Sequence, residues 1–182
     1  MLNADYIHQD LRDALEAAWC AETAYPSCRA DYPDKDPSWG NCFVSSLVIW
    51  AVQGGEVCLG VVDTPNDEGL WHARNVLEGH GHGVGDIDVD ATWQQFDQPA
   101  VFHPGYNGLQ SEIIVESVFN DETLLPRLSL LIGRMKEKAG YIVPKSAEEI
   151  VSDLRQAYRI YDPSARATGA SFSGGQRRLG LS

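Results

Sequence analysis

The chain is poor in basic residues. Lys and Arg number 14 against 26 Asp and Glu, so the formal net charge is −12. A protein that binds nucleic acid needs a basic face to meet the phosphates. The charge balance therefore disfavours nucleic acid as a partner, whereas a peptide, a protein or a small amide remains a suitable substrate.

Long hydrophobic runs are also missing. No window approaches the ~20 apolar residues that span a bilayer, and the N-terminal residues carry acids instead of the apolar segment of a secretion signal. We therefore expect a cytoplasmic protein with no membrane partner. Apolar residues still make up 43% of the 182 residues, which is enough for one core. We predict a single domain over residues 1–162 and a flexible tail over 163–182, where the apolar pattern is lost.

Cysteine is scarce and shows no zinc-binding spacing. The four cysteines, none of which forms a CxxC pair, are Cys20, Cys28, Cys42 and Cys58. In a reducing compartment we expect them to stay free thiols, and we interpret all except Cys42 as structural. A glycine-rich stretch holds other metal-ligand types, namely His80, His82, Asp86 and Asp88. Because such a stretch between strands is usually only a turn, we expect no metal and no cofactor.

Hydrophobic periodicity predicts an α+β chain. Helices are predicted over residues 7–24, 42–53, 121–139 and 146–160, the last opened by a capping box of Ser146 and Glu149. Residues 42–53 are apolar almost all round, which indicates a buried helix, and Gly54 and Gly55 end it. Strands are predicted over 56–63, 69–78 and 85–93. We expect loops over 25–41, 64–68 and 97–112.

Three residues in these elements have the side chains of a nucleophilic site. Cys42 opens the buried helix, His72 lies in the second strand and Asp90 in the third. A free thiol has a pKa of about 8.5, and the N-terminus of a helix favours its thiolate. A neighbouring imidazole takes the proton, and an acid holds that imidazole in the correct tautomer. This chain order is that of papain-like and transglutaminase-like hydrolases, so we predict Cys42, His72 and Asp90 as catalytic residues.

The sequence pattern leaves alternatives for the acid and for the amides that support the site. Asp86, Asp88 and Asp90 share one face of the predicted strand, so Asp88 is an alternative third member. Asn41 directly precedes the cysteine and is a candidate either to stabilise an oxyanion together with the Cys42 N–H or to orient such a donor. Asn75 is a candidate orienting amide for the histidine.

Four stretches together resemble the YunG-like family: "DALEAAWCAETAY", "DPSWGNCFVSSLVIWAVQGGEV", "WHARNVL" and "VDATWQQF". Asp90 falls on the family's Asp-x-Thr pattern, which favours it over Asp88. Asn41 stands where the family usually has Gln, and "HARN" replaces an aromatic-rich segment after the histidine. The resemblance covers roughly residues 10–138. It implies a papain-like core, with the cysteine-bearing helix packed on an antiparallel sheet and further helices at the C-terminal end.

Two classes of function fit these observations. The first is a cysteine hydrolase or acyl-transferase that acts on an amide or related acyl bond, as an amidase, protease, deamidase or transglutaminase-like enzyme. The second is a non-catalytic binding module on the same fold, such as a phage-encoded inhibitor of a host or defence protein, in which an acidic surface meets a basic partner. The sequence leaves the substrate and the oligomeric state open.

Overall fold

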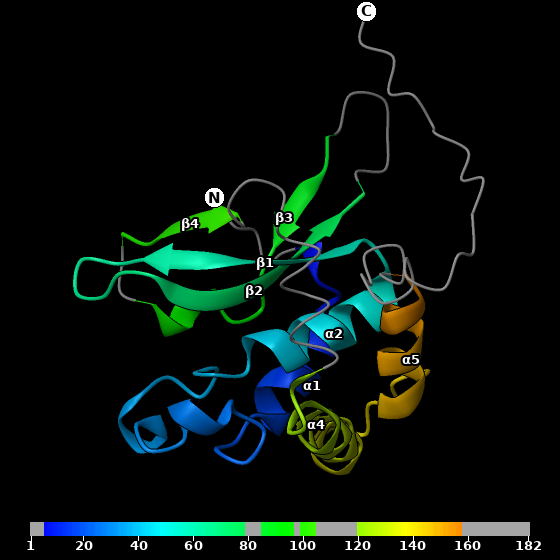
Figure 1. Cartoon of the computed structure of the whole chain (residues 1–182). Helices are drawn as coiled ribbons and strands as arrows, with labels where there is room; N and C mark the ends of the chain where they lie inside the picture. The colour runs from blue at the N-terminus through cyan, green and yellow to red at the C-terminus, as the bar shows by residue number, and fades with distance from the viewer. Residues whose placement is uncertain (1–5, 79–84, 97–98, 105–119, 158–182) are drawn as a thin grey trace, which may run out of the picture.

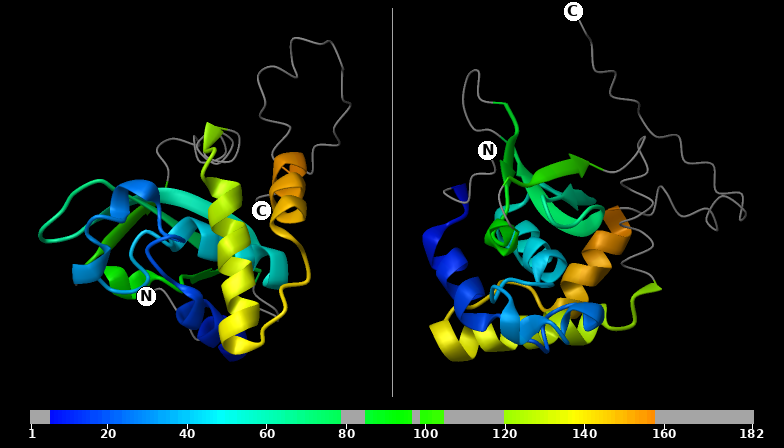
Figure 2. Two further views of the ribbon diagram at one scale, coloured as in Figure 1. Left: turned by 90° about the horizontal axis from the view of Figure 1, so that it is seen from below. Right: turned by 90° about the vertical axis from the view of Figure 1, so that its left-hand side faces the viewer.

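The computed structural model describes residues 6–78, 85–96, 99–104 and 120–157. They form an α+β fold in which the helices gather on one side of a four-stranded sheet (Figures 1 and 2). The longer elements are α1 (Gln9–Ala18), α2 (Cys42–Gln53), β1 (Glu56–Asp63), β2 (Leu70–Leu77), β3 (Ile87–Val89), β4 (Val101–Pro104), α4 (Leu124–Ala139) and α5 (Ala147–Ala157). Short 3-10 helices are η2 (Pro26–Cys28), η3 (Tyr32–Asp34) and η4 (Trp93–Gln95).

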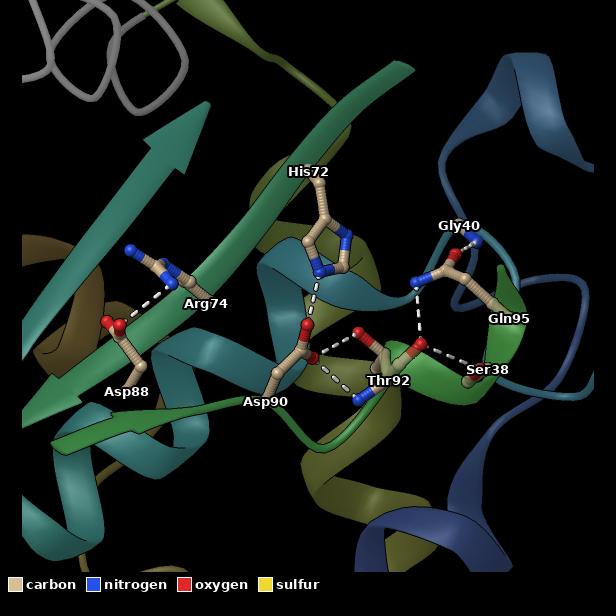
Figure 3. Close-up of polar contacts among 8 residues, drawn as sticks. All are labelled: Ser38, Gly40, His72, Arg74, Asp88, Asp90, Thr92 and Gln95. Carbon is tan, nitrogen blue, oxygen red and sulfur yellow. Dashed lines mark hydrogen bonds and ion pairs between the residues drawn. The ribbon is translucent and has the colours of Figure 1, made fainter. Parts of the chain in front are cut away.

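The sheet is antiparallel throughout, with the strand order β3-β2-β1-β4. β1 pairs with β2 along its length, and Gly60 lies opposite His72. β3 pairs with β2 only from Asn75 to Leu77. Among the described residues, the first half of β2 therefore has no strand neighbour on that side. His72 lies in this half, and the chain that leaves β3 turns towards it (Figure 3).

Helix α2 lies between the sheet and the other helices. It contacts β1 and β2 on one side and α4 and α5 on the other (Figure 1). Val44, Leu47 and Val48 are completely buried, and burial of such a side chain contributes roughly 1.5–3 kcal/mol. The prediction of a buried helix over 42–53 is confirmed, and β1 matches its predicted range as well.

The first predicted helix and the third predicted strand are longer than the observed elements, because side-chain hydrogen bonds to the backbone form turns at their C-terminal ends. The first helix was expected to reach residue 24, but it ends at Ala18. The Thr23 hydroxyl oxygen accepts the Cys20 N–H at 3.0 Å and its O–H donates to the Cys20 carbonyl at 2.8 Å, so a turn replaces further helix. The strand predicted over 85–93 ends at Val89. There the Asp90 carboxylate accepts the Thr92 N–H at 2.8 Å, which closes a turn.

The C-terminal helices are as the sequence predicts in type and approximate range. The capping box at α5 is confirmed, since the Ser146 N–H donates to Glu149 Oε2 and the Glu149 N–H donates to Ser146 Oγ. β4 falls in a stretch for which a loop was expected. Its four residues carry too short an alternation to indicate a strand, and pairing with β1 stabilises it.

Other expectations are partly covered by the structure. All four cysteines lie within the described residues, and none forms a disulfide. Cys58 is buried, in agreement with its expected structural role. No helix among the described residues is long and apolar enough to cross a bilayer. The predicted tail over 163–182, together with His80 and His82, lies outside the described residues.

Candidate active site

Cys42 is the first residue of α2, and its side chain lines a pocket of about 640 Å³. The Ser45 N–H donates to the Asn41 carbonyl at 3.0 Å and so begins the hydrogen-bond ladder of the helix. The N–H groups of Cys42, Phe43 and Val44 precede that ladder and have no acceptor within the helix. The thiol thus lies at the end of the helix that carries partial positive charge.

A glycine turn places the cysteine. Gly40 has φ of 72°, in the left-handed region, and a Cβ there would lie 2.7 Å from Cys28 Cβ. Only glycine combines this conformation with so close an approach. The Tyr25 N–H also donates to the Gly40 carbonyl at 2.9 Å. The chain before Cys42 is therefore held against the η2 segment.

His72 is almost fully buried, and its ring is enclosed by aromatic side chains. The ring centroids of Phe96, Trp93 and Phe102 lie 4.8, 5.9 and 6.2 Å from that of His72, all in edge-on geometry. His72 Nε2 is hydrogen-bonded to Asp90 Oδ2 (Figure 3). Nδ1 is also buried, but no described residue provides it with a hydrogen-bond partner. Such an orphaned buried atom needs an explanation.

The charge state of His72 follows from its neighbours. Burial alone would lower the pKa of His72, but the charge and hydrogen bond of Asp90, with a further contribution from Cys42, raise that pKa to about 10. The imidazole is therefore a cation at neutral pH. The Cys42 thiol is near enough to contribute to this rise, although it does not complete a hydrogen bond of normal geometry to Nδ1. The structure thus brings Cys42, His72 and Asp90 together.

Thr92 fixes the Asp90 carboxylate through the oxygen that does not face His72. Oδ1 accepts the N–H of Thr92 at 2.8 Å and its hydroxyl at 2.9 Å, which leaves Oδ2 for His72. Asp88 instead meets Arg74 at 3.1 Å and is half exposed, and Figure 3 shows this pair apart from the imidazole. Of the acids on the predicted strand face, Asp90 and not Asp88 therefore reaches the histidine.

Gln95 joins the two halves of the site. Its Nε2 donates to the Thr92 carbonyl at 2.9 Å, and its Oε1 accepts the Gly40 N–H at 3.3 Å (Figure 3). Ser38 Oγ approaches the same Thr92 carbonyl at 3.4 Å. The turn that holds Asp90 is thereby linked to the turn that presents Cys42.

The side-chain amides of Asn41 and Asn75 both donate to backbone carbonyls. Asn41 is fully buried and does not line the pocket, and its Nδ2 donates to the carbonyls of Pro37 and Trp39 at 3.2 and 3.4 Å. In this geometry the Asn41 amide orders the loop before Cys42, and the residue is not part of the pocket lining. Asn75 lies three positions from His72, on the opposite face of the strand. Its Nδ2 donates to the Ser46 carbonyl at 3.0 Å, so it fastens β2 to α2 and does not orient the imidazole.

Sequence reasoning gave no role to Thr92, Gln95 or the aromatic residues around His72. The signal was present, because the "DATWQQF" stretch contains all of these except Phe102. Their roles depend on the turn at 90–92, which brings this stretch against the loop before Cys42. Among the described residues, no group of three or more His, Cys, Asp and Glu side chains is arranged to hold a metal ion.

A helix-borne cysteine and a buried histidine that line one pocket, with an aspartate bonded to that histidine, define an α+β protein with a candidate thiol-based site. The family model described as YunG protein matches residues 7–126, and the chain belongs to this family. The matched region runs from just before α1 into the first turn of α4 and includes Cys42, His72, Asp90, Thr92 and Gln95. No curated protein and no solved structure matches the chain.

Proposed function

We propose that the chain is a cysteine-dependent hydrolase or acyl-transferase that acts on an amide or related acyl bond. One observation carries the proposal: the buried imidazole of His72 is held by Asp90 at Nε2 and has no described hydrogen-bond partner at Nδ1, on a pocket that Cys42 also lines. This arrangement leaves one ring nitrogen for proton transfer while the other fixes the tautomer.

The proposed reaction follows from these positions. The Cys42 sulfur, as thiolate, attacks the carbonyl carbon, and the oxyanion that forms lies near the free N–H groups at the start of α2. His72 is already protonated, so Nδ1–H gives its proton to the leaving amine as the C–N bond breaks. Water or an amine then attacks the thioester and gives a proton to His72, and the C–S bond breaks to release the acyl product and return the Cys42 thiolate. Asp90 stays ionised and keeps the ring in place.

The finer assignment to a papain-like or transglutaminase-like fold belongs to the same proposal. It is supported by a cysteine-bearing helix that packs on an antiparallel sheet and by the chain order of cysteine, histidine and aspartate. Substrates of this class are peptides, proteins or small amides. The acidic net charge of −12 disfavours polyanionic ones.

Alkylation by iodoacetamide tests the nucleophile, and Cys28 provides a control within the same pocket. Mass spectrometry after timed labelling at pH 7 gives a rate for each thiol. We expect Cys42 to react at least about tenfold faster than Cys28, because, within the part of the chain that the structure describes, the imidazolium of His72 contributes at Cys42 and no histidine does so at Cys28. His72→Gln should remove most of this difference.

Equal rates for Cys42 and Cys28 would show the enzyme proposal to be wrong and would favour the non-catalytic binding module. Loss of all labelling in folded protein would have the same meaning. Cys42→Ser serves as the companion variant. It should keep the circular dichroism spectrum and melting temperature of the parent and show no modification at residue 42.

A further inference from the structure

The pocket beside Cys42 is bordered by two exposed aromatic side chains. Trp71 of β2 is 65% exposed and Tyr25, just before η2, is 48% exposed. A large aromatic side chain stabilises a fold mainly when it is buried. Exposure of two of them on one pocket therefore indicates a surface that a ligand covers.

The remaining wall of the pocket is mostly apolar. Its apolar members include Trp39, Phe43, Leu59, Leu70, Ala73 and Phe96. Besides His72, the charged members among the described lining residues are Asp121 and Arg127, and these pair with each other at 2.7 Å between Arg127 Nη2 and Asp121 Oδ2. The Arg127 guanidinium also lies 5.1 Å from the Tyr25 ring centroid. This ion pair is already satisfied, so it offers no unpaired charge to a charged substituent.

The proposed reaction at Cys42 indicates which part of the substrate occupies the pocket. After attack, the acyl group stays bonded to Cys42 Sγ, while the leaving group departs. The acyl substituents must therefore fit in the pocket that the sulfur lines. A volume of about 640 Å³ is in the range of sites that enclose a drug-sized molecule, which is ample for a large side chain.

We propose that the acyl part of the substrate carries a large apolar or aromatic side chain that packs on Trp71 and Tyr25. This inference rests on the proposed function. It assigns Trp71 as a residue that determines specificity: it contacts the substrate and takes no part in proton transfer.

Three chloromethyl ketones test the preference: N-acetyl derivatives of phenylalanine, glycine and aspartate. Each alkylates a reactive thiol, and its rate constant with Cys42 is divided by its rate constant with glutathione to remove intrinsic reactivity. We expect the phenylalanine reagent to exceed the glycine reagent by about tenfold or more, as is usual for an apolar pocket. The aspartate reagent should be the slowest.

Trp71→Ala should reduce the phenylalanine-to-glycine ratio by about fivefold or more. Because Trp71 is exposed, the variant should fold normally. Tyr6→Ala is the matched control, since Tyr6 is an exposed aromatic residue that does not line the pocket. It should leave the ratio as it is.

The outcomes separate the two proposals. If Cys42 reacts rapidly with iodoacetamide but treats the phenylalanine and glycine reagents alike, or prefers aspartate, the inference about the substrate is wrong and the nucleophile stands. An unchanged ratio in Trp71→Ala also overturns it. If Cys42 is no more reactive than Cys28 towards iodoacetamide, the proposed function itself fails.

Discussion

His72 is the residue whose environment most constrains the chemistry. Burial opposes its positive charge, and Asp90 more than offsets that opposition. The charge of Asp90 is in turn stabilised by the two hydrogen bonds from Thr92. The sequence indicated Asp90 through a short motif, whereas strand alternation alone left Asp88 equally placed. The structure separates the two because the strand ends at Val89 and only Asp90 turns inward.

The raised pKa of His72 predicts a pH-dependent contribution to stability. The folded-state pKa of about 10 lies above the usual histidine pKa of 6.5, so the contribution is complete below about pH 6.5 and is lost as the pH rises through 10. Asp90→Asn should lower the free energy of unfolding by roughly 3–5 kcal/mol at pH 6. The loss should be clearly smaller at pH 9.5, as measured by urea denaturation.

The control for this prediction is Asp88→Asn. That carboxylate is half exposed and pairs with Arg74, so its removal should cost less than about 1 kcal/mol at either pH. If the deficit of Asp90→Asn stays constant or grows as the pH rises, His72 is not a buried cation in the folded protein.

At the scale of elements, the site depends on two turns meeting. One turn precedes α2 and the other follows β3, and Gln95 bonds to both. The bounds of α2 were predictable because local sequence marks both ends of the helix: a Gly-Asn step precedes the apolar run and two glycines follow it. The turn after β3 was not predicted, since it depends on hydrogen bonds of a single carboxylate.

Gln95 offers a direct test of this link. Gln95→Ala removes the hydrogen bonds to Gly40 and Thr92, and we expect the alkylation rate of Cys42 to fall by about tenfold or more. Gln94→Ala is the matched control, because the neighbouring side chain is exposed. Gln95→Glu keeps an acceptor for the Gly40 N–H but loses the donor to Thr92, so its rate should be intermediate.

A role in stability alone would change the melting temperature of Gln95→Ala and leave the reactivity of Cys42 in the folded protein unaltered. The link would then be structural and would not position the site. The two readouts are taken on the same samples, below the onset of unfolding.

At the scale of the whole molecule, α4 closes the core on the side away from the sheet. It contacts α1, α2 and α5, and Arg134 Nε donates to the Ala18 carbonyl at 2.6 Å. The same helix places Arg127 at the pocket. The pocket and the core are therefore supported by one element that begins inside the matched family region and continues beyond it.

Two adjacent leucines of α4 test its contribution. Leu131 is 0% exposed and Leu130 is 38% exposed. Leu131→Ala should lower the free energy of unfolding by about 2–5 kcal/mol, because it leaves a cavity between helices. Leu130→Ala should cost less than about 1 kcal/mol. Equal losses in urea denaturation would contradict the packing of α4 described above.

The sequence by itself determined the α+β class, the family, the buried helix that Cys42 opens, and the three residues that meet at the site. These follow from hydrophobic periodicity, glycine positions and short motifs, which act over a few residues.

Tertiary structure decided how the polar groups are used. Asn41 and Asn75 were predicted to serve the site, yet the nearest acceptors for their amides are backbone carbonyls of the loop and of α2. Gln95 and Thr92 took supporting roles because segments more than 50 residues apart in sequence are brought into contact. Contacts between such distant segments leave no periodic pattern in the local sequence, so the sequence does not predict them.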